Sequence, residues 1–203
     1  MIVAAKVLNS TNQWQSVTPL YDVNNQVGVT GFINNQSYQY GFEQWLNNDI
    51  LKDLKLGYLD CYRSHNFNDL AERVIIFQLL RGNIWYIGNL YGVKQLCYNE
   101  IEEIQNQLIE QNWLDIINNN FIEIGDLRLL DETHEYLQHY NANHIVGNPD
   151  TNPFILNIRY SELKLLTNPI NLTQIYPQIN NKWRRLSIRY NNIPNELIQI
   201  FDL

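Results

Sequence analysis

The sequence predicts an α+β fold in which a curved sheet or a small β-barrel is flanked by helices, because strand patterns fill its first half and helical patterns its centre. The strand-like segments are apolar and β-branched, or alternate between apolar and polar residues. They cover residues 2–8, 56–62, 73–80 and 83–96. The short turn Arg81-Gly82-Asn83 joins the last two, so we expect an antiparallel hairpin there.

The helical segments have an apolar side. One is expected over residues 40–54, and a second should begin at an Asn99 N-cap, with Glu102 reaching back to it, and run to about residue 112. Further patterns occur later in the chain. They predict strands over 154–160 and 182–190 and a terminal helix over 194–201.

Composition excludes several classes of protein. The chain has 203 residues, of which 45% are hydrophobic and 17% charged, a balance typical of a globule and not of a disordered chain. The longest apolar run, over 74–80, is shorter than the ~20 residues that cross a bilayer, and the first residues lack a signal-peptide pattern. We therefore expect a soluble, cytoplasmic protein without membrane contact, in which Cys61 and Cys97 are buried thiols.

No sequence pattern indicates catalysis or a cofactor. The chain lacks the GxGxxG, P-loop, HExxH, CxxC and GxSxG patterns. His134, His139 and His144 recur every five residues, a spacing that does not bring them to one metal on either a helix or a strand. We expect no enzyme activity, no metal and no cofactor.

Charge is unevenly distributed along the chain. The net charge is -7, yet residues 99–151 carry 11 acidic and 1 basic residue, whereas residues 152–203 carry 6 basic and 3 acidic. The late basic residues are candidates for contacts with nucleic-acid phosphates: Lys182, Arg184, Arg185 and Arg189. Two alternatives are that these charges are simply solvated, or that the acidic block binds a protein partner.

An aromatic and acidic group near the second strand is a candidate base pocket. Tyr58 and Asp60 are two residues apart, so on a strand they share a face, and a carboxylate beside an aromatic ring can accept a hydrogen bond from a heterocycle that stacks there. Trp14 and Trp45 are candidates for the walls, and Trp85 for a further one. The alternatives are that Asp60 pairs with Arg63 or Arg73 and that the tryptophans pack in the core.

Several of these residues carry a resemblance to a known family. They occur in the segments Leu8-Asn9 with Trp14, Gly31-Phe32, Tyr40-Gly41-Phe42-Glu43-Gln44-Trp45-Leu46, Leu56-Gly57-Tyr58-Leu59-Asp60, Trp85-Tyr86-Ile87-Gly88-Asn89-Leu90 and Gln111-Asn112-Trp113-Leu114. Their order resembles the EVE-like, PUA-superfamily domain at the N-terminus of McrA-type HNH modification-dependent restriction endonucleases. In this chain Phe42 stands where that family often has His, and Asp60-Cys61 replaces its Gln-Gly.

The resemblance implies a base-sensing domain over 1–125 and a C-terminal extension over 126–203 that packs on the same domain. It implies that the protein binds double-stranded DNA and flips a modified base, 5-methylcytosine or 5-hydroxymethylcytosine, into a pocket formed by Trp14, Phe42, Trp45, Tyr58 and Asp60. Cutting would belong to a separate or fused HNH nuclease domain, so this chain would be the reader alone. An RNA-binding PUA-like module and a protein-interaction domain are the alternatives.

Overall fold

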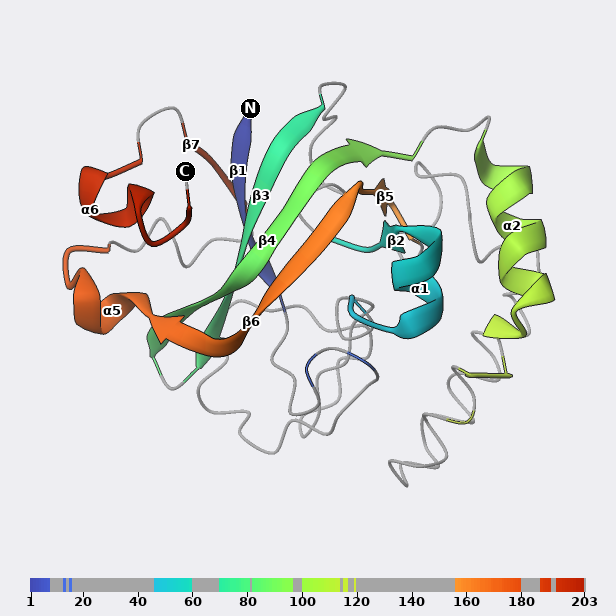
Figure 1. The fold of residues 1–203 in the computed structure, drawn as a ribbon, viewed down its shortest axis with the longest axis horizontal. Helices are drawn as coiled ribbons and strands as arrows, with labels where there is room; N and C mark the ends of the chain where they lie inside the picture. The colour runs from blue at the N-terminus through green and yellow to red at the C-terminus, as the bar shows by residue number, and fades with distance from the viewer. Residues whose placement is uncertain are drawn as a thin grey trace.

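The structure is a computed structural model of residues 1–203, and it describes residues 1–7, 13, 15, 46–59, 70–80, 82–96, 100–113, 115–116, 119, 156–179, 187–190 and 193–202. Its strands form one mixed sheet in the order β2-β5-β4-β3-β1-β7, and β6 also pairs with β4 (Figure 1). The strands are β1 (Ile2–Val7), β2 (Leu56–Gly57), β3 (Ala71–Leu80), β4 (Asn83–Gln95), β5 (Ile158–Arg159), β6 (Glu162–Asn171) and β7 (Ser187–Tyr190).

Helices lie at two ends of this sheet. The helices are α1 (Asp49–Leu54), α2 (Ile101–Glu110), α5 (Leu172–Ile175) and α6 (Asn195–Ile198). In Figure 1, α5 and α6 lie on the left of the sheet and α1 and α2 on the right. None of the helices among the described residues is long and apolar enough to cross a membrane.

The centre of the sheet is the predicted hairpin of β3 and β4. The two strands pair antiparallel from Ala71 opposite Val93 to Leu80 opposite Asn83, so the hairpin prediction is confirmed. At the turn, Gly82 has φ 76, which glycine adopts at low steric cost. On its other edge, β3 pairs in parallel with β1, and β1 pairs antiparallel with β7. Strand β3 is therefore interior to the sheet, which explains its nearly continuous apolar run.

The sheet has a hydrophobic core on each face. One cluster, here the α1-side core, includes Val74, Ile76 and Leu90 of the hairpin. The other, here the C-terminal core, includes Ile75 and Phe77 of the same strand. Other members come from segments outside β1, β3 and β4. They include Leu46, Leu59, Ile158 and Tyr160 in the α1-side core, and Leu172, Leu197 and Phe201 in the C-terminal core.

A bulge in β4 decides which core receives Tyr86. The register shifts between Ile76 and Phe77 on β3, so that Gly88 pairs with Ile76 whereas Tyr86 pairs with Phe77. Strict alternation would put Tyr86 on the same face as Gly88, and the extra residue of the bulge moves it to the C-terminal core. Gly88 has φ 152, and a Cβ there would collide with the carbonyl oxygen of Lys164 on β6. Glycine is therefore required where β4 and β6 approach each other.

Several sequence predictions need correction. The α+β class is confirmed, but over the described residues the sheet is open, in place of a barrel, because its end strands β2 and β7 are short and lie at opposite edges. The strand predicted over 56–62 ends at Gly57, and that over 154–160 includes only Ile158 and Arg159. Strand β6 was not predicted, because its Leu-Leu pair and Pro169 break the alternation.

The predicted helix boundaries also change. Helix α1 begins at Asp49, because the Asn48 side chain accepts from the amide of Ile50 and caps it. Helix α2 has Glu100 as its N-cap residue, without a side-chain cap hydrogen bond, where the sequence had indicated Asn99. The carboxylate of Glu100 is instead 3.0 Å from Lys94 Nζ and 3.5 Å from Arg159 Nε. It therefore joins the start of α2 to β4 and β5.

Candidate functional site

The start of α1 holds the chain on both sides of Trp14. Asn47 Nδ2 donates to the carbonyl oxygen of Gln13 at 3.1 Å, and Asn48 Nδ2 donates to that of Gln15 at 3.1 Å. These two asparagines follow Trp45 directly in the chain. Hydrogen bonds spanning 33 and 34 residues thus bring the neighbours of one predicted pocket residue to the neighbours of another.

The end of β2 joins the same region. Lys55 is the C-cap of helix α1. Its φ of 57 is left-handed, and its amide donates to the carbonyls of Leu51 and Lys52. Strand β2 follows directly. Leu59, which precedes Asp60, lies in the α1-side core together with Leu46, which follows Trp45. The described neighbours of three predicted pocket residues therefore lie near the start of α1 or in the same core as Leu46: Gln13, Gln15 and Leu59.

Asn157 fixes the backbone at the predicted Tyr58 and Asp60 pair. Its Nδ2 donates to the Leu59 carbonyl at 2.9 Å, and its Oδ1 accepts from the Leu59 amide at 3.0 Å. Its own amide donates to Gly57 O and its carbonyl accepts from Leu96 N, each at 3.0 Å. One asparagine thus continues the pairing of β2 with both its side chain and its backbone, on either side of Tyr58.

Tyr58 is the one predicted pocket residue whose side chain the described part includes. It is 7% exposed, so its ring packs mainly against protein. The residue lies just beyond β2 and not within a strand, so the predicted strand does not include Tyr58. The other proposed pocket residues, Trp14, Phe42, Trp45 and Asp60, lie outside the described residues.

The remaining predicted residues do not join this region. Trp85 pairs with Gln78 of β3 and Asn171 of β6. It lies about 30 Å along β4 from Lys94, the residue at which β4 pairs with β5. Its Nε1 is buried and has no hydrogen-bond partner among the described residues. Of the proposed phosphate contacts, Arg189 lies in β7 opposite Val3, and Lys182, Arg184 and Arg185 lie outside the described residues.

Arg73, an alternative partner for Asp60, is engaged elsewhere. Its guanidinium donates to the carbonyl oxygens of Phe201, at 2.9 Å, and of Asp202, and it lies 4.8 Å from the centre of the Tyr91 ring. These contacts attach the end of the chain to the C-terminal core. Within the described part of the chain, no three potential metal ligands lie together in a group that could hold a metal ion.

Tyr160 is a buried residue near this region that the sequence did not single out. It is 3% exposed and belongs to the α1-side core with Leu46 and Leu59, yet its hydroxyl has no hydrogen-bond partner in the described part of the chain. Burial, followed by the negative charge of Asp53, raises the pKa of Tyr160 far above its ordinary value. The hydroxyl therefore stays neutral and remains both a donor and an acceptor. An unpaired polar atom has no signature in sequence, so only the structure reveals it.

Comparison of the chain with models of protein families, with curated proteins and with solved structures finds no match.

Proposed function

We propose that this protein is a DNA-binding reader module that flips a modified base, 5-methylcytosine or 5-hydroxymethylcytosine, into an aromatic pocket. In this proposal the pocket consists of Trp14, Phe42, Trp45, Tyr58 and Asp60. The observation that supports it best is the pair of hydrogen bonds from Asn47 and Asn48 to the residues that flank Trp14. They bring together segments that the resemblance to EVE-like domains assigns to one site.

The fixed backbone around Tyr58 is what such a pocket requires. Extruding a base from a duplex costs a few kcal/mol, which stacking at about 1 to 3 kcal/mol per base and hydrogen bonds to the base edge can offset. This compensation is largest when the pocket is already ordered before binding, because little further entropy is then lost. Three hydrogen bonds between Asn157 and the residues Gly57 and Leu59 give that order to residues 57–59.

The finer fold assignment belongs to the same proposal. A PUA-like or EVE-like domain would place the base pocket beside a curved sheet, and the described sheet supports the α+β part of that assignment. Contacts with phosphates are proposed for Lys182, Arg184, Arg185 and Arg189. A nuclease would then be supplied by a separate or fused HNH domain, as specificity and cleavage are divided in the family that the chain resembles.

Binding to matched duplexes tests the proposal. Duplexes of one sequence should carry a single cytosine, 5-methylcytosine, 5-hydroxymethylcytosine or N6-methyladenine, with fluorescence anisotropy measured at two salt concentrations. We expect a preference for a modified cytosine, about 1 to 3 kcal/mol weaker binding for Trp14→Ala, and an altered base preference for Asp60→Asn. Asp115→Asn, at an exposed position, makes the same change of charge and should bind as the wild type does.

The phosphate contacts have a different signature. Arg184→Ala or Arg185→Ala should weaken binding to all four duplexes alike and reduce the dependence of affinity on salt. Equal affinity of the wild-type protein for all four duplexes at low salt would refute the reader proposal. Stronger binding to the matching RNA would favour the RNA-binding alternative.

Helix α2 supports a second candidate function, a docking surface for a basic protein segment. Glu103 and Glu110 are exposed on this helix, and Ile109 beside them is 49% exposed. Residues 99–151 carry 11 acidic and 1 basic residue, and this charge favours a basic partner. Glu103→Gln with Glu110→Gln should abolish binding of a basic partner and leave DNA binding intact. Loss of DNA binding in this variant would contradict the separation of the two functions.

A further inference from the structure

Strand β6 lies at an edge of the described sheet. It pairs with β4 on one side, and no other strand among the described residues pairs with its second side (Figure 1). It has 10 residues, whereas β2 and β7, at the two ends of the strand order, have 2 and 4. No residue of β6 is buried, in contrast to most residues of β3. A long exposed edge offers backbone donors and acceptors with which another strand can pair.

The first part of β6 is its regular part. Over 162–165 each residue pairs in turn with one residue of β4. Beyond Leu165 the register shifts, so that Ile170 pairs with Tyr86 and residues 166–169 stand opposite Ile87 alone. This bulge contains Pro169, which has no amide hydrogen to donate. Pairing with a further strand is therefore expected over 162–165 and not over the bulge.

Glu162 and Lys164 give this part of the edge a pattern of charge. Their side chains are 54% and 59% exposed, and Lys164 Nζ lies 3.5 Å from Glu162 Oε1. An ion pair as exposed as this contributes little to stability, so both groups can take other partners. Charged side chains on an edge strand usually keep other chains from pairing with it. The order Glu-Leu-Lys is an exception when the partner is an identical strand, because it is complementary to itself in the antiparallel direction.

Only one antiparallel register of two β6 strands satisfies these charges. When Leu163 lies opposite Leu163 of a second copy, Glu162 of each copy faces Lys164 of the other. A shift by two residues puts two glutamates or two lysines opposite each other, which is unfavourable. A shift by one residue puts a charge opposite a leucine and turns matching side chains to opposite faces. The sequence of β6 thus selects one register.

We propose that β6 is a self-association edge, at which two copies of this chain pair antiparallel about a two-fold axis at Leu163. Two equivalent contacts between Glu162 and Lys164 then form, as the symmetry of such an interface requires. Leu163 and Leu165, which are only partly buried against the α1-side core, gain cover from the second strand. A contact of this length is smaller than a standard interface, so the association is weak and depends on concentration. The proposal does not depend on the reader function.

Charge variants at these two positions test the proposal. Sedimentation velocity over a range of protein concentrations gives the Kd of the dimer. We expect the wild type to dimerise, and Glu162→Lys or Lys164→Glu alone to raise the Kd about tenfold, since each puts like charges opposite each other twice. An equimolar mixture of the two variants should restore association, because one variant then carries two positive charges where the other carries two negative charges. The double variant Glu162→Lys with Lys164→Glu keeps the net charge of -7 and should associate as the wild type does.

Glu196→Lys is the matched control. It makes the same change of net charge as Glu162→Lys, at an exposed position of α6, and should leave the Kd unchanged. A wild type that is monomeric at all concentrations would overturn the proposal. So would single variants that associate as the wild type does, or a mixture that stays monomeric although circular dichroism shows both variants folded. None of these results bears on the reader function, because the experiment contains no DNA.

Discussion

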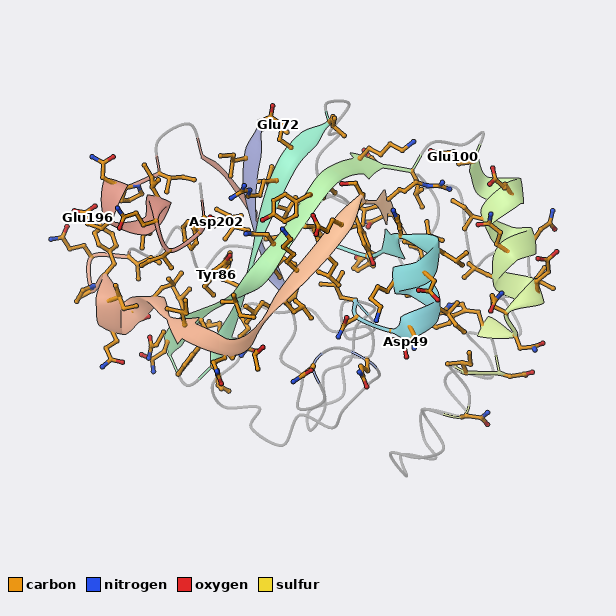
Figure 2. The ribbon with its side chains drawn as sticks, viewed as in Figure 1. Asp49, Glu72, Tyr86, Glu100, Glu196 and Asp202 are labelled. Atoms are coloured by element: carbon orange, nitrogen blue, oxygen red, sulfur yellow. The ribbon has the colours of Figure 1, made fainter. Side chains whose placement is uncertain are left out.

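Tyr86 and Tyr160 lie in the two cores of the protein and are buried to the same extent, each with 3% of its surface exposed. Figure 2 shows Tyr86 on the side of the molecule that holds Asp202, α5 and α6. There its ring meets that of Phe201 edge to face, with centroids 5.0 Å apart, and the Asn89 side chain lies close enough to oppose the rise in its pKa that burial causes. The hydroxyl of Tyr160 has no hydrogen-bond partner among the described residues.

The surroundings of the two tyrosines differ in the same way. In the C-terminal core, Asn89 also donates to the carbonyl oxygen of Phe201 and to the hydroxyl of Tyr91, each at 3.3 Å, and Arg73 holds the backbone of the last residues. These donors hold the end of the chain, although Asn89 Oδ1 is itself buried without a hydrogen-bond partner in the described part of the chain. In the α1-side core the polar contacts go to the backbone of Gly57 and Leu59, and none of those described reaches the Tyr160 hydroxyl. The two cores therefore differ in the polar surroundings of their tyrosines.

The largest expected effect comes from Gly88→Ala, which breaks the bulge that puts Tyr86 in the C-terminal core. The new Cβ would meet the Lys164 backbone, with Leu165 Cα at 2.9 Å, at a φ that alanine rarely adopts. Overpacking and backbone strain together should lower the free energy of unfolding by about 3 to 5 kcal/mol. Urea unfolding followed by circular dichroism measures this loss.

Gly82→Ala is the matched control for this change. Gly82 also has a positive φ, of 76, but no atom lies within 4 Å of an added Cβ. Only the strain remains, and it should cost about 1 to 2 kcal/mol. Equal losses in the two variants would mean that β4 and β6 do not need the close approach at Gly88.

Asn157→Asp tests the polar contacts of the α1-side core. The change removes the amide donor to Leu59 O and places a carboxylate oxygen against that carbonyl. Because Leu59 is buried, we expect a loss of about 2 to 3 kcal/mol in unfolding free energy, measured by urea titration, together with weaker DNA binding. Asn106→Asp, on the exposed surface of α2, should change neither. Unchanged DNA binding in Asn157→Asp would separate this core from the binding site.

Alkaline pH should act on both buried tyrosines. Burial is the main cause that raises the pKa of Tyr86 to about 12, with a further increase from Tyr91, and burial raises that of Tyr160 as well. The folded state therefore keeps these protons where the unfolded state, with a pKa near 10, loses them. Their stabilising contribution is complete below about pH 10 and is lost as the pH rises toward 12, at about 1.4 kcal/mol per pH unit for each tyrosine.

Unfolding free energies at pH 9, 10 and 11 measure this slope. The double variant Tyr86→Phe with Tyr160→Phe should lose stability less steeply above pH 10 than the wild type does. An identical slope in the two proteins would show that neither phenol is held neutral by the fold.

The smallest effect is the one that compares the two tyrosines directly at neutral pH. Tyr86→Phe removes a buried hydroxyl near the Asn89 side chain and should cost about 1 kcal/mol in unfolding free energy. Tyr160→Phe removes an unpaired hydroxyl and should cost nothing or stabilise the protein slightly. Thermal and urea unfolding of both variants gives the comparison. Equal losses would show that Tyr160 has a structural partner, and the contrast between the two cores would disappear.

The sequence alone determined the elements whose patterns are local. The apolar, β-branched runs predicted β1, β3 and β4 to within two residues, and glycine in the turn predicted the hairpin. These predictions succeed because strand alternation and turn conformation depend on residues close in the chain. Helix capping is also local, and Asn48 caps α1 with its side chain, although the sequence predicted that this helix begins near residue 40.

Only the tertiary structure decided the face on which Tyr86 lies, the open form of the described sheet, and the burial of the Tyr160 hydroxyl without a partner among the described residues. The bulge at Gly88 depends on the approach of β6, which lies more than 70 residues further along the chain. Asn157 reaches Leu59 across 98 residues. Whether a buried hydroxyl finds a partner likewise depends on distant segments meeting, and a sequence pattern carries no record of such a meeting.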